Sequence, residues 1–333
     1  LDHLPRDAFF ASYGRGATAA DLEPLRRVLM AGLRDFIVRD GFSADQAGAV
    51  VAPLQKIFFT GGPWVLAFGN PPDRARAALD AYIDAGKTTQ AARVKARIGS
   101  SGWMVAGVEE PASVWTSAVR ALVAADAARP AHKPQAKRPV EHMSTHIFLT
   151  QVSPALKLPP GTLHLEMRTA PNPAWVAANP KPSHWLVDSF PPHTEHVFFV
   201  PDGAARTWLA ASEDPALAAA QARASLSGAP ASGTIASRAD LEAFRATPAS
   251  VAGFTAVTAF ASLVSDRATD SDLKRARKML DGLSRMTGGG ATPVPWSLAV
   301  TPAPGAAGDV RMRLQFPVSI ALEAAASMGS LLP

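Results

Sequence analysis

Histidine is the chemically active residue whose distribution along this chain is uneven. Imidazole and carboxylate groups are ligands for Zn²⁺ or another divalent ion, and a glutamate can act as the base for metal-bound water. His193, Glu195 and His196 stand together in one tetrapeptide and form a candidate metal site. A metal-dependent hydrolase would need at least three nearby ligands to converge on one ion. Seven of the eight histidines lie in one stretch: His132, His142, His146, His164, His184, His193 and His196.

The sequence around this candidate also argues against a metal. Pro191 and Pro192 precede the tetrapeptide and an apolar run follows it, so it does not reproduce the helical His-Glu-x-x-His pattern that places both histidines on one face. Histidines scattered over a surface are also commoner than metal sites. The first expectation is therefore no cofactor, with Zn²⁺ as the alternative.

Two further motifs fail on their context. Gly86–Thr88 resembles the end of a phosphate-binding loop, but the first glycine of that motif would have to stand at Ala81, and a helix precedes it where a strand is needed. Ser271 and Lys274 have the spacing of acylating serine enzymes, but the companion Lys-Thr-Gly tract is missing and Ser271 is explained as a helix cap. The sequence therefore predicts no catalytic and no cofactor-binding residue.

The stretch 197–227 is the clearest structural unit. An apolar run meets the turn signal Pro201-Asp202-Gly203, and a second run follows, which predicts a β-hairpin. Ser212 or Asp214 then caps a helix in which Pro215 takes the first turn, where a missing N–H is tolerated. The unit is a strand, a tight turn, a strand and a capped helix that Gly228 ends.

The same order of elements is predicted twice more. Strands 93–98 and 103–108 form a hairpin followed by a helix after Pro111, and strands 296–301 and 310–316 are followed by a helix from Pro317 to about Gly329. With Pro215, the helix-opening prolines are separated by 104 and 102 residues. This spacing suggests two or three related modules of about a hundred residues.

The remaining elements fit the same class. Strands occur mostly as hairpins and helices follow them, so the predicted fold is α+β with antiparallel sheets. The Pro, Lys and Ala-rich segment 128–140 is predicted to link an N-terminal half, 1–127, to a C-terminal half, 141–333. The other predicted strands cover 8–13, 57–59, 64–68, 147–152, 163–168, 185–187 and 254–257, and the other helices cover 18–41, 43–54, 70–86, 237–246 and 273–286.

Five tryptophans fall in predicted strands: Trp64, Trp103, Trp185, Trp208 and Trp296. They can line a ligand groove. The favoured interpretation is that they pack between sheet and helix, with each indole N–H finding a hydrogen-bond partner.

Composition narrows the class of protein. The chain has 333 residues, 47% of them hydrophobic, which is enough to bury a substantial core in about two domains. The net charge of +5 invites a nucleic-acid interpretation, but the basic residues are scattered, so no nucleic-acid partner is expected. No run is long enough to cross a bilayer. The chain contains no cysteine, which excludes disulfides and thiolate catalysis.

The chain also resembles a group of bacterial proteins. The tract 4–8, the tract Thr207–Leu209 before a helix, and the tract 234–254 are similar to exported or lipoprotein-like proteins of GC-rich, myxobacterial-type bacteria, which carry no assigned activity. The resemblance covers about half of the chain and implies export. With the absence of cysteine and a start at Leu1, it predicts a periplasmic or extracellular location after removal of a leader.

These observations favour a non-enzymatic exported bacterial protein. It would bind a protein partner or an apolar ligand, with the cleft between its halves as the default site, or serve as a component of an envelope assembly. The alternative is a metal-dependent hydrolase that uses the central histidines.

Overall fold

We describe a computed structural model of the chain. It covers residues 2–16, 18–39, 43–57, 61–86, 89–128, 143–178, 192–242, 249–258, 269–285, 289–303 and 306–322. The predicted linker beyond Ala128 and the predicted strand 185–187 lie outside these ranges, as do His132, His142 and His184.

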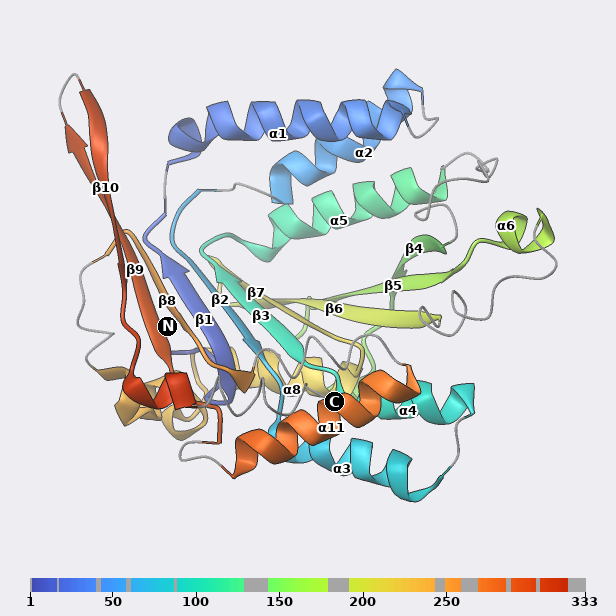
Figure 1. The fold of residues 1–333 in the computed structure, drawn as a ribbon. Coiled ribbons are helices and arrows are strands. Elements are labelled where there is room, and N and C mark those ends of the chain that lie inside the picture. Colours follow the sequence, from blue (N-terminus) through green and yellow to red (C-terminus); the bar gives the residue numbers. More distant parts are fainter. Residues whose placement is uncertain are drawn as a thin grey trace.

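Helices and strands alternate along most of the chain (Figure 1). The helices are α1 (Ala19–Arg39), α2 (Ala44–Ile57), α3 (Pro72–Asp84), α4 (Gln90–Ser100), α5 (Ala112–Ala127), α6 (Pro173–Ala178), α8 (Pro215–Ser225) and α11 (Asp270–Ser284). The strands are β1 (Ala8–Gly14), β2 (Trp64–Gly69), β3 (Trp103–Val108), β4 (Met143–Thr150), β5 (Leu163–Pro171), β6 (His193–Asp202), β7 (Arg206–Ser212), β8 (Val251–Thr255), β9 (Val294–Ala303) and β10 (Ala306–Leu314).

All these strands join one sheet. Their order is β10-β9-β8-β1-β2-β3-β7-β6-β5-β4, and every neighbouring pair is antiparallel. The α+β class with an antiparallel sheet is confirmed. Strands from both sides of the predicted linker pair with each other, β1 with β8 and β3 with β7, so the two predicted halves share this sheet. Their division at 128–140 stays a prediction.

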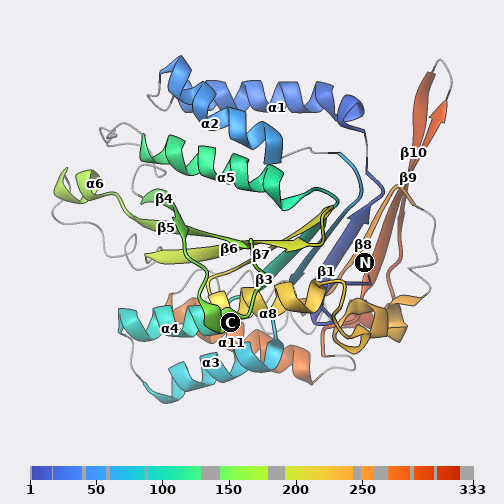
Figure 2. The same cartoon turned by 180° about the vertical axis from the view of Figure 1, so that it is seen from behind.

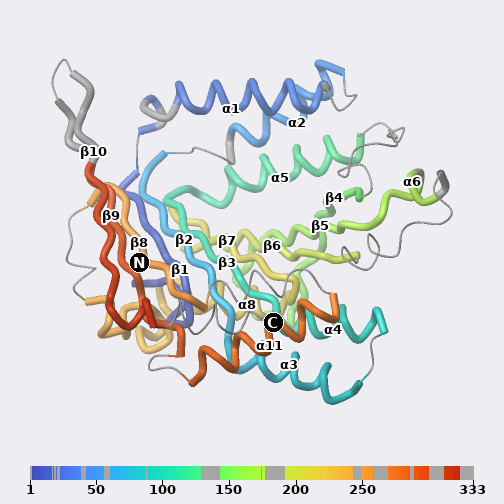
Figure 3. Tube along the Cα trace, viewed as in Figure 1, coloured from blue at the N-terminus to red at the C-terminus, as the bar shows by residue number. Residues whose placement is uncertain are grey.

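Helices cover both faces of the sheet. Figure 1 and the reverse view in Figure 2 show α1, α2 and α5 on one side and α3, α4, α8 and α11 on the other. The tube in Figure 3 shows that the β9–β10 hairpin forms one edge and β4 lies at the other end. One core packs α8 against the sheet, with Phe198 and Trp208 buried in it. A second core packs Trp115 of α5 against Phe199 on the opposite face.

The hairpin and the helix start of the unit 197–227 form as predicted, although α8 ends at Ser225 with Leu226 as its C-cap and not at Gly228. β6 and β7 pair through the turn, where Gly203 takes a positive φ of 71°. Asp214 is the N-cap of α8, and its Oδ1 accepts hydrogen bonds from the backbone N–H groups of Ala216 at 2.8 Å and Leu217 at 3.3 Å. A capping box starts α2, where Ser43 followed by Gln46 is the sequence signature of a helix start: the two residues exchange backbone to side-chain hydrogen bonds at 2.9 and 3.2 Å.

The predicted strand 93–98 is wrong, because these residues belong to α4. Thr89 caps this helix by accepting a hydrogen bond from the Ala92 N–H, and the helix packs Ala96 against Leu79 of α3 and Leu273 of α11. The alternation of basic and apolar residues in 93–98 is therefore not evidence of a strand, because the segment is a helix that packs against two other helices. β3 consequently has no hairpin partner before it and pairs with β2 and β7.

Two other boundaries differ from prediction. Ile57 is the last residue of α2, and the rest of the predicted strand 57–59 lies outside the described residues; β2 pairs with β1 and β3. The N-cap of α11 is Thr269, whose Oγ1 accepts from the Asp272 N–H at 3.1 Å, and not Ser271 or its neighbour Asp270, the two caps that the sequence indicates.

The prolines that suggested a repeat all stand at helix starts. Pro111 is the N-cap of α5, Pro215 is the first residue of α8, and a helix begins directly after Pro317. β9 and β10 form the predicted C-terminal hairpin. However, the first predicted module contains α4 in place of its first strand, so the repeat itself stays a prediction.

Cross-strand pairs of glycine and tryptophan set the register of the central strands. Gly107 lies opposite Trp208, and a Cβ on Gly107 would stand 2.5 Å from the indole ring. The pairs Gly14 with Trp64, Gly69 with Trp103 and Gly253 with Trp296 have the same arrangement. The predicted packing of tryptophans is confirmed at two positions, since Trp208 donates its indole N–H to Asp202 at 3.1 Å and Trp103 donates to Asp7 at 3.2 Å.

Within the described ranges, no helix has the length and apolar composition needed to cross a membrane.

Candidate functional site

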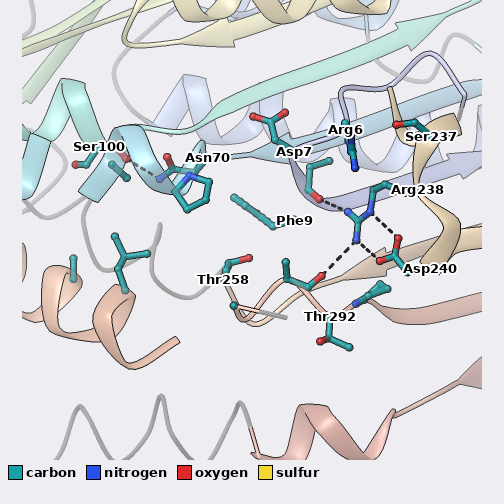
Figure 4. Close-up of a pocket in the computed structure, with 18 of the residues that line it drawn as sticks. Arg6, Asp7, Phe9, Asn70, Ser100, Ser237, Arg238, Asp240, Thr258 and Thr292 are labelled. Atoms are coloured by element: carbon teal, nitrogen blue, oxygen red, sulfur yellow. Dashed lines mark hydrogen bonds and ion pairs between the residues drawn. The ribbon is translucent and has the colours of Figure 1, made fainter. Parts of the chain in front are cut away.

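A cavity of about 680 Å³ opens on the sheet face covered by α3 and α11 (Figure 4). Its walls come from segments far apart in the sequence: the entry into β1, the start of α3, the turns 237–240, α11 and the segment before β9. These segments belong to both predicted halves. The cavity therefore occupies the kind of position that the sequence suggested for a binding site.

Most of the cavity wall is apolar. Phe9 of β1, labelled in Figure 4, lines it together with Leu79 of α3 and Leu280 of α11. Polar groups are gathered at its ends, with Arg238 and Asp240 at one end in Figure 4 and Asn70 beside Ser100 at the other. Ligand pockets commonly combine such an apolar wall with a few placed polar groups.

Arg238 fixes one end of the cavity. Its guanidinium makes two hydrogen bonds to Asp240, at 3.1 and 2.7 Å, and donates to the carbonyls of Ala8 at 3.0 Å and Ala291 at 3.4 Å. It also lies over the ring of Phe254, 5.1 Å from the centroid. The hydrogen bonds and charge of Arg238 lower the pKa of the Asp240 carboxyl, and the nearby charge of Arg6 adds to this effect. Arg238 thus holds β1, the 237–240 turns and the entry to β9 together.

Asp7 lines the cavity near Arg6. Its side chain is exposed to solvent, and its carboxyl accepts hydrogen bonds from neighbouring side chains. Burial raises the pKa of Asp7, and hydrogen bonds from Trp103 at 3.2 Å and Gln221 at 3.5 Å act in the opposite direction. The cavity therefore contains an acid that favours its neutral form more than an aspartate of ordinary pKa does.

The histidine-rich tetrapeptide does not converge in the predicted way. His193, Glu195 and His196 lie on β6, where successive side chains point to opposite faces. His193 and Glu195 therefore share one face, and His196 lies on the other. A site made of these three residues would require a helix or a loop at this place, and the chain forms a strand.

The structure instead joins His196 to two residues of β5. Glu166 of β5 lies directly opposite His196 of β6 in the register. His164 precedes Glu166 by two residues on the same strand, so all three side chains lie on one face of the sheet. His164 Nε2 and His196 Nδ1 are 3.0 Å apart, and Glu166 Oε1 is 3.9 Å from His196 Nδ1. One ligand atom from each residue lies within 4.8 Å of the other two. We call these three residues the histidine cluster.

The cluster is enclosed by the same helical layer that forms the cavity. The His164 ring stacks on Phe198, with 4.4 Å between the centroids. Burial lowers the pKa of His164, and the charge of His196 lowers it further. Burial also lowers the pKa of His196, against the opposing charges of Glu166 and Asp214. Both imidazoles therefore favour the neutral form.

Glu166 stays ionised in this cluster. Burial acts to raise its pKa, but hydrogen bonds and charge from Arg168 lower it on balance. Arg168 donates two hydrogen bonds to Glu166 Oε2, at 3.0 and 2.5 Å, which leaves Oε1 on the side of His196. The cluster thus combines two neutral imidazoles with one oriented carboxylate.

The other described histidines lie apart from the cluster. His146, on β4, is half-exposed, and its Nδ1 is 3.5 Å from Asp126 of α5. His193 is opposite Thr169 at the start of β6. His3 lies beside Trp208, with 6.4 Å between the ring centroids.

The two rejected motifs occupy helix ends. Gly86 follows α3 with a positive φ of 58°, as a helix-ending residue does, and Lys87 and Thr88 lie outside the described residues. Ser271 is in the first turn of α11, and Lys274 pairs with Asp270 at 2.8 Å.

Comparisons with models of protein families, with curated proteins and with solved structures find no match for this chain. The interpretation of both sites accordingly rests on their own geometry.

Sequence reasoning missed Glu166 and the cavity. Glu166 stands in the alternating run Leu163–Arg168, and its position two residues after His164 was the available signal for a shared strand face. Its approach to His196 depends on the register between β5 and β6, which the sequence does not reveal. The cavity depends on segments as distant as Arg6 and Pro293 and had no local signal.

Proposed function

We propose that the protein is a non-enzymatic binding protein whose cavity holds a small, largely apolar organic ligand with polar ends. The observation that carries the proposal is the cavity itself. Its volume of about 680 Å³ lies within the range of roughly 300–1,000 Å³ that is usual for small-molecule sites. Phe9, Leu79 and Leu280 would contact the apolar body of the ligand.

The polar groups suggest how such a ligand would be oriented. Arg6 lies near the Arg238–Asp240 pair, and its charge supports an anionic or hydrogen-bond-accepting group at that end. Asp7, whose pKa is raised, lines the cavity beside Arg6 and would offer its carboxyl oxygens to the polar end of the ligand. The ligand class proposed is therefore an amphipathic molecule with an acceptor group at the Arg6 end.

A fluorescence titration with 1-anilinonaphthalene-8-sulfonate tests this proposal, because the probe has aromatic rings and one anionic group. Ala239 is exposed and lines the cavity, so Ala239→Trp should obstruct it and weaken binding of the probe by about tenfold or more, equivalent to about 1.4 kcal/mol. Ala231→Trp, at an exposed position in a nearby turn, is the matched control and should bind the probe as the wild type does. Equal affinity in Ala239→Trp and in the wild type would contradict the proposal.

The alternative of an envelope assembly is favoured by a different observation. The long helix α1 exposes large apolar side chains, with Val28 70% and Phe36 61% accessible. Apolar surface of this kind is typical of contact faces when it is continuous. Light scattering on the purified protein tests this alternative. A wild-type mass above that of one chain, with the mass of a single chain for Val28→Lys, would support assembly through α1. A monomeric wild type would exclude self-assembly through α1.

Export also belongs to this proposal. The absence of cysteine and the resemblance to exported bacterial proteins support a periplasmic or extracellular location. Fractionation of cells that express the complete gene product tests it. Recovery of the protein with the cytosolic fraction would contradict export.

The metal-dependent hydrolase stays a second prediction. It would use the histidine cluster, with Glu166 in the role predicted for Glu195, and it requires that the cluster bind a metal ion.

A further inference from the structure

The histidine cluster has the spacing of a metal site. A tetrahedral zinc ion with bonds of about 2.0–2.1 Å holds two nitrogen ligands about 3.3 Å apart. His164 Nε2 and His196 Nδ1 are 3.0 Å apart, close to that separation. Glu166 Oε1 is 3.9 Å from His196 Nδ1, and the ligand atoms of the three residues lie within 4.8 Å of one another, so Glu166 needs to approach by roughly 0.6–1.5 Å to reach the same ion.

The backbone already fixes the positions of these three residues. His164 and Glu166 are held on one face of β5, and His196 is held opposite Glu166 by the β5–β6 ladder. Stacking on Phe198 further restricts the His164 ring. Binding an ion would therefore require small side-chain adjustments, without rearrangement of the strands.

The groups around the cluster orient its donor atoms. Arg168 occupies Glu166 Oε2 and leaves Oε1 facing His196. His164 Nε2 faces His196 Nδ1 at 3.0 Å. Partners of this kind hold metal-binding histidines and carboxylates in place in known metal sites.

The two facing nitrogens leave room for only one proton between them. His164 Nε2 and His196 Nδ1 approach at hydrogen-bond distance, so without an ion one of them carries a proton and the other accepts it. An ion bound between them would replace that proton, so metal binding releases it.

From this geometry we propose that His164, Glu166 and His196 bind a divalent transition-metal ion such as Zn²⁺. Two nitrogens and one carboxylate oxygen supply three ligands, which leaves the fourth tetrahedral position to water or another small ligand. The mixed nitrogen and oxygen donors suit Zn²⁺ better than Ca²⁺ or Mg²⁺, which prefer oxygen ligands alone. This site is separate from the cavity, so the metal and the organic ligand can be tested independently.

Metal binding to the chelator-treated full-length chain tests the proposal. Calorimetric titration with ZnCl₂ and elemental analysis after gel filtration should both give one zinc ion per chain. Glu166→Gln and His196→Asn should each weaken binding by about 100-fold. Co²⁺ in place of Zn²⁺ should give the visible absorption of a four-coordinate ion, and both variants should lose it.

His146→Asn is the matched control, because His146 lies on the neighbouring strand β4 and outside the cluster. It should bind zinc as the wild type does. Circular dichroism will show whether each variant is folded, and Glu166→Gln keeps the size of the side chain in case His196→Asn fails to fold. The proposal is overturned if the wild type binds no stoichiometric zinc, or if zinc remains bound with unchanged affinity in folded Glu166→Gln.

Discussion

The cavity and the histidine cluster lie under the same helical layer of one sheet, but they are built from different parts of the chain. The cluster comes from two neighbouring strands, β5 and β6, and its three side chains are in mutual reach. The cavity is enclosed by segments spread between Arg6 and Pro293. The first arrangement selects a ligand by donor atoms and their spacing. The second selects a ligand by volume, with few polar groups.

Burial acts on titratable groups in both places and favours their neutral forms. It raises the pKa of Asp7 in the cavity and lowers the pKa of His164 and His196 in the cluster. For the aspartate, the neutral form has gained a proton. For the histidines, the neutral form has lost one and exposes a lone pair. One physical cause thus makes the cavity less anionic and prepares the cluster for a cation.

The largest predicted effect concerns the residue that holds the cavity open. Arg238→Ala removes hydrogen bonds to Asp240, Ala8 and Ala291, so we expect a loss of about 2–3 kcal/mol in the free energy of unfolding. Urea denaturation measures it. Arg27, which has a largely exposed side chain on α1, is the control, and Arg27→Ala should change stability by less than about 0.5 kcal/mol. Equal effects of the two substitutions would show that Arg238 does not brace the cavity.

The second prediction compares the effect on stability of a larger side chain in the packed core beside the cluster and at the cavity. Ala210, on β7 opposite Phe198, is fully buried in the packed core next to the cluster, so Ala210→Leu should destabilise the protein by about 1–3 kcal/mol. Ala291, in the segment before β9, lines the cavity and is exposed, so Ala291→Leu can extend into open space and should cost less than about 1 kcal/mol. Thermal denaturation of both variants measures the difference. A larger loss in Ala291→Leu would mean that the cavity has no room for added atoms.

The smallest predicted effect is the pH dependence from Asp7. Because the pKa of Asp7 is raised above 3.8, the folded state keeps this proton to a higher pH than the unfolded chain does. The resulting stabilisation is present below pH 3.8 and is lost as pH rises through the folded pKa. Asp7→Asn cannot ionise, so its stability relative to the wild type should increase between about pH 4 and pH 7.

Urea denaturation across that range measures this change. We expect it to be modest, because solvent reaches Asp7 through the cavity. A stability difference between the two proteins that does not vary with pH would contradict the raised pKa.

The sequence predicted what local chemistry determines. Pro201-Asp202-Gly203 specifies a turn, Asp214 and Pro215 specify a helix start, and the Ser43–Gln46 pair specifies another. Each was confirmed, because the interactions responsible lie within a few residues.

Features that depend on distant contacts were not predictable. The segment 93–98 alternates as a strand does, but packing against α3 and α11 makes it a helix. Glu195 was chosen over Glu166 because it is adjacent to His196 in the sequence, whereas strand alternation and register decide which carboxylate faces the imidazole. The pairing register of β5 and β6 places Glu166 beside His196, and the sequence around either glutamate does not reveal that register.

The most direct test of the central claim is a crystal structure of the protein grown with 1-anilinonaphthalene-8-sulfonate. The account predicts the rings of the probe against Phe9 and Leu280, with the sulfonate near Arg6. A cavity closed by direct contact between Phe9 and Leu280, or a probe bound only on the exposed face of α1, would contradict it.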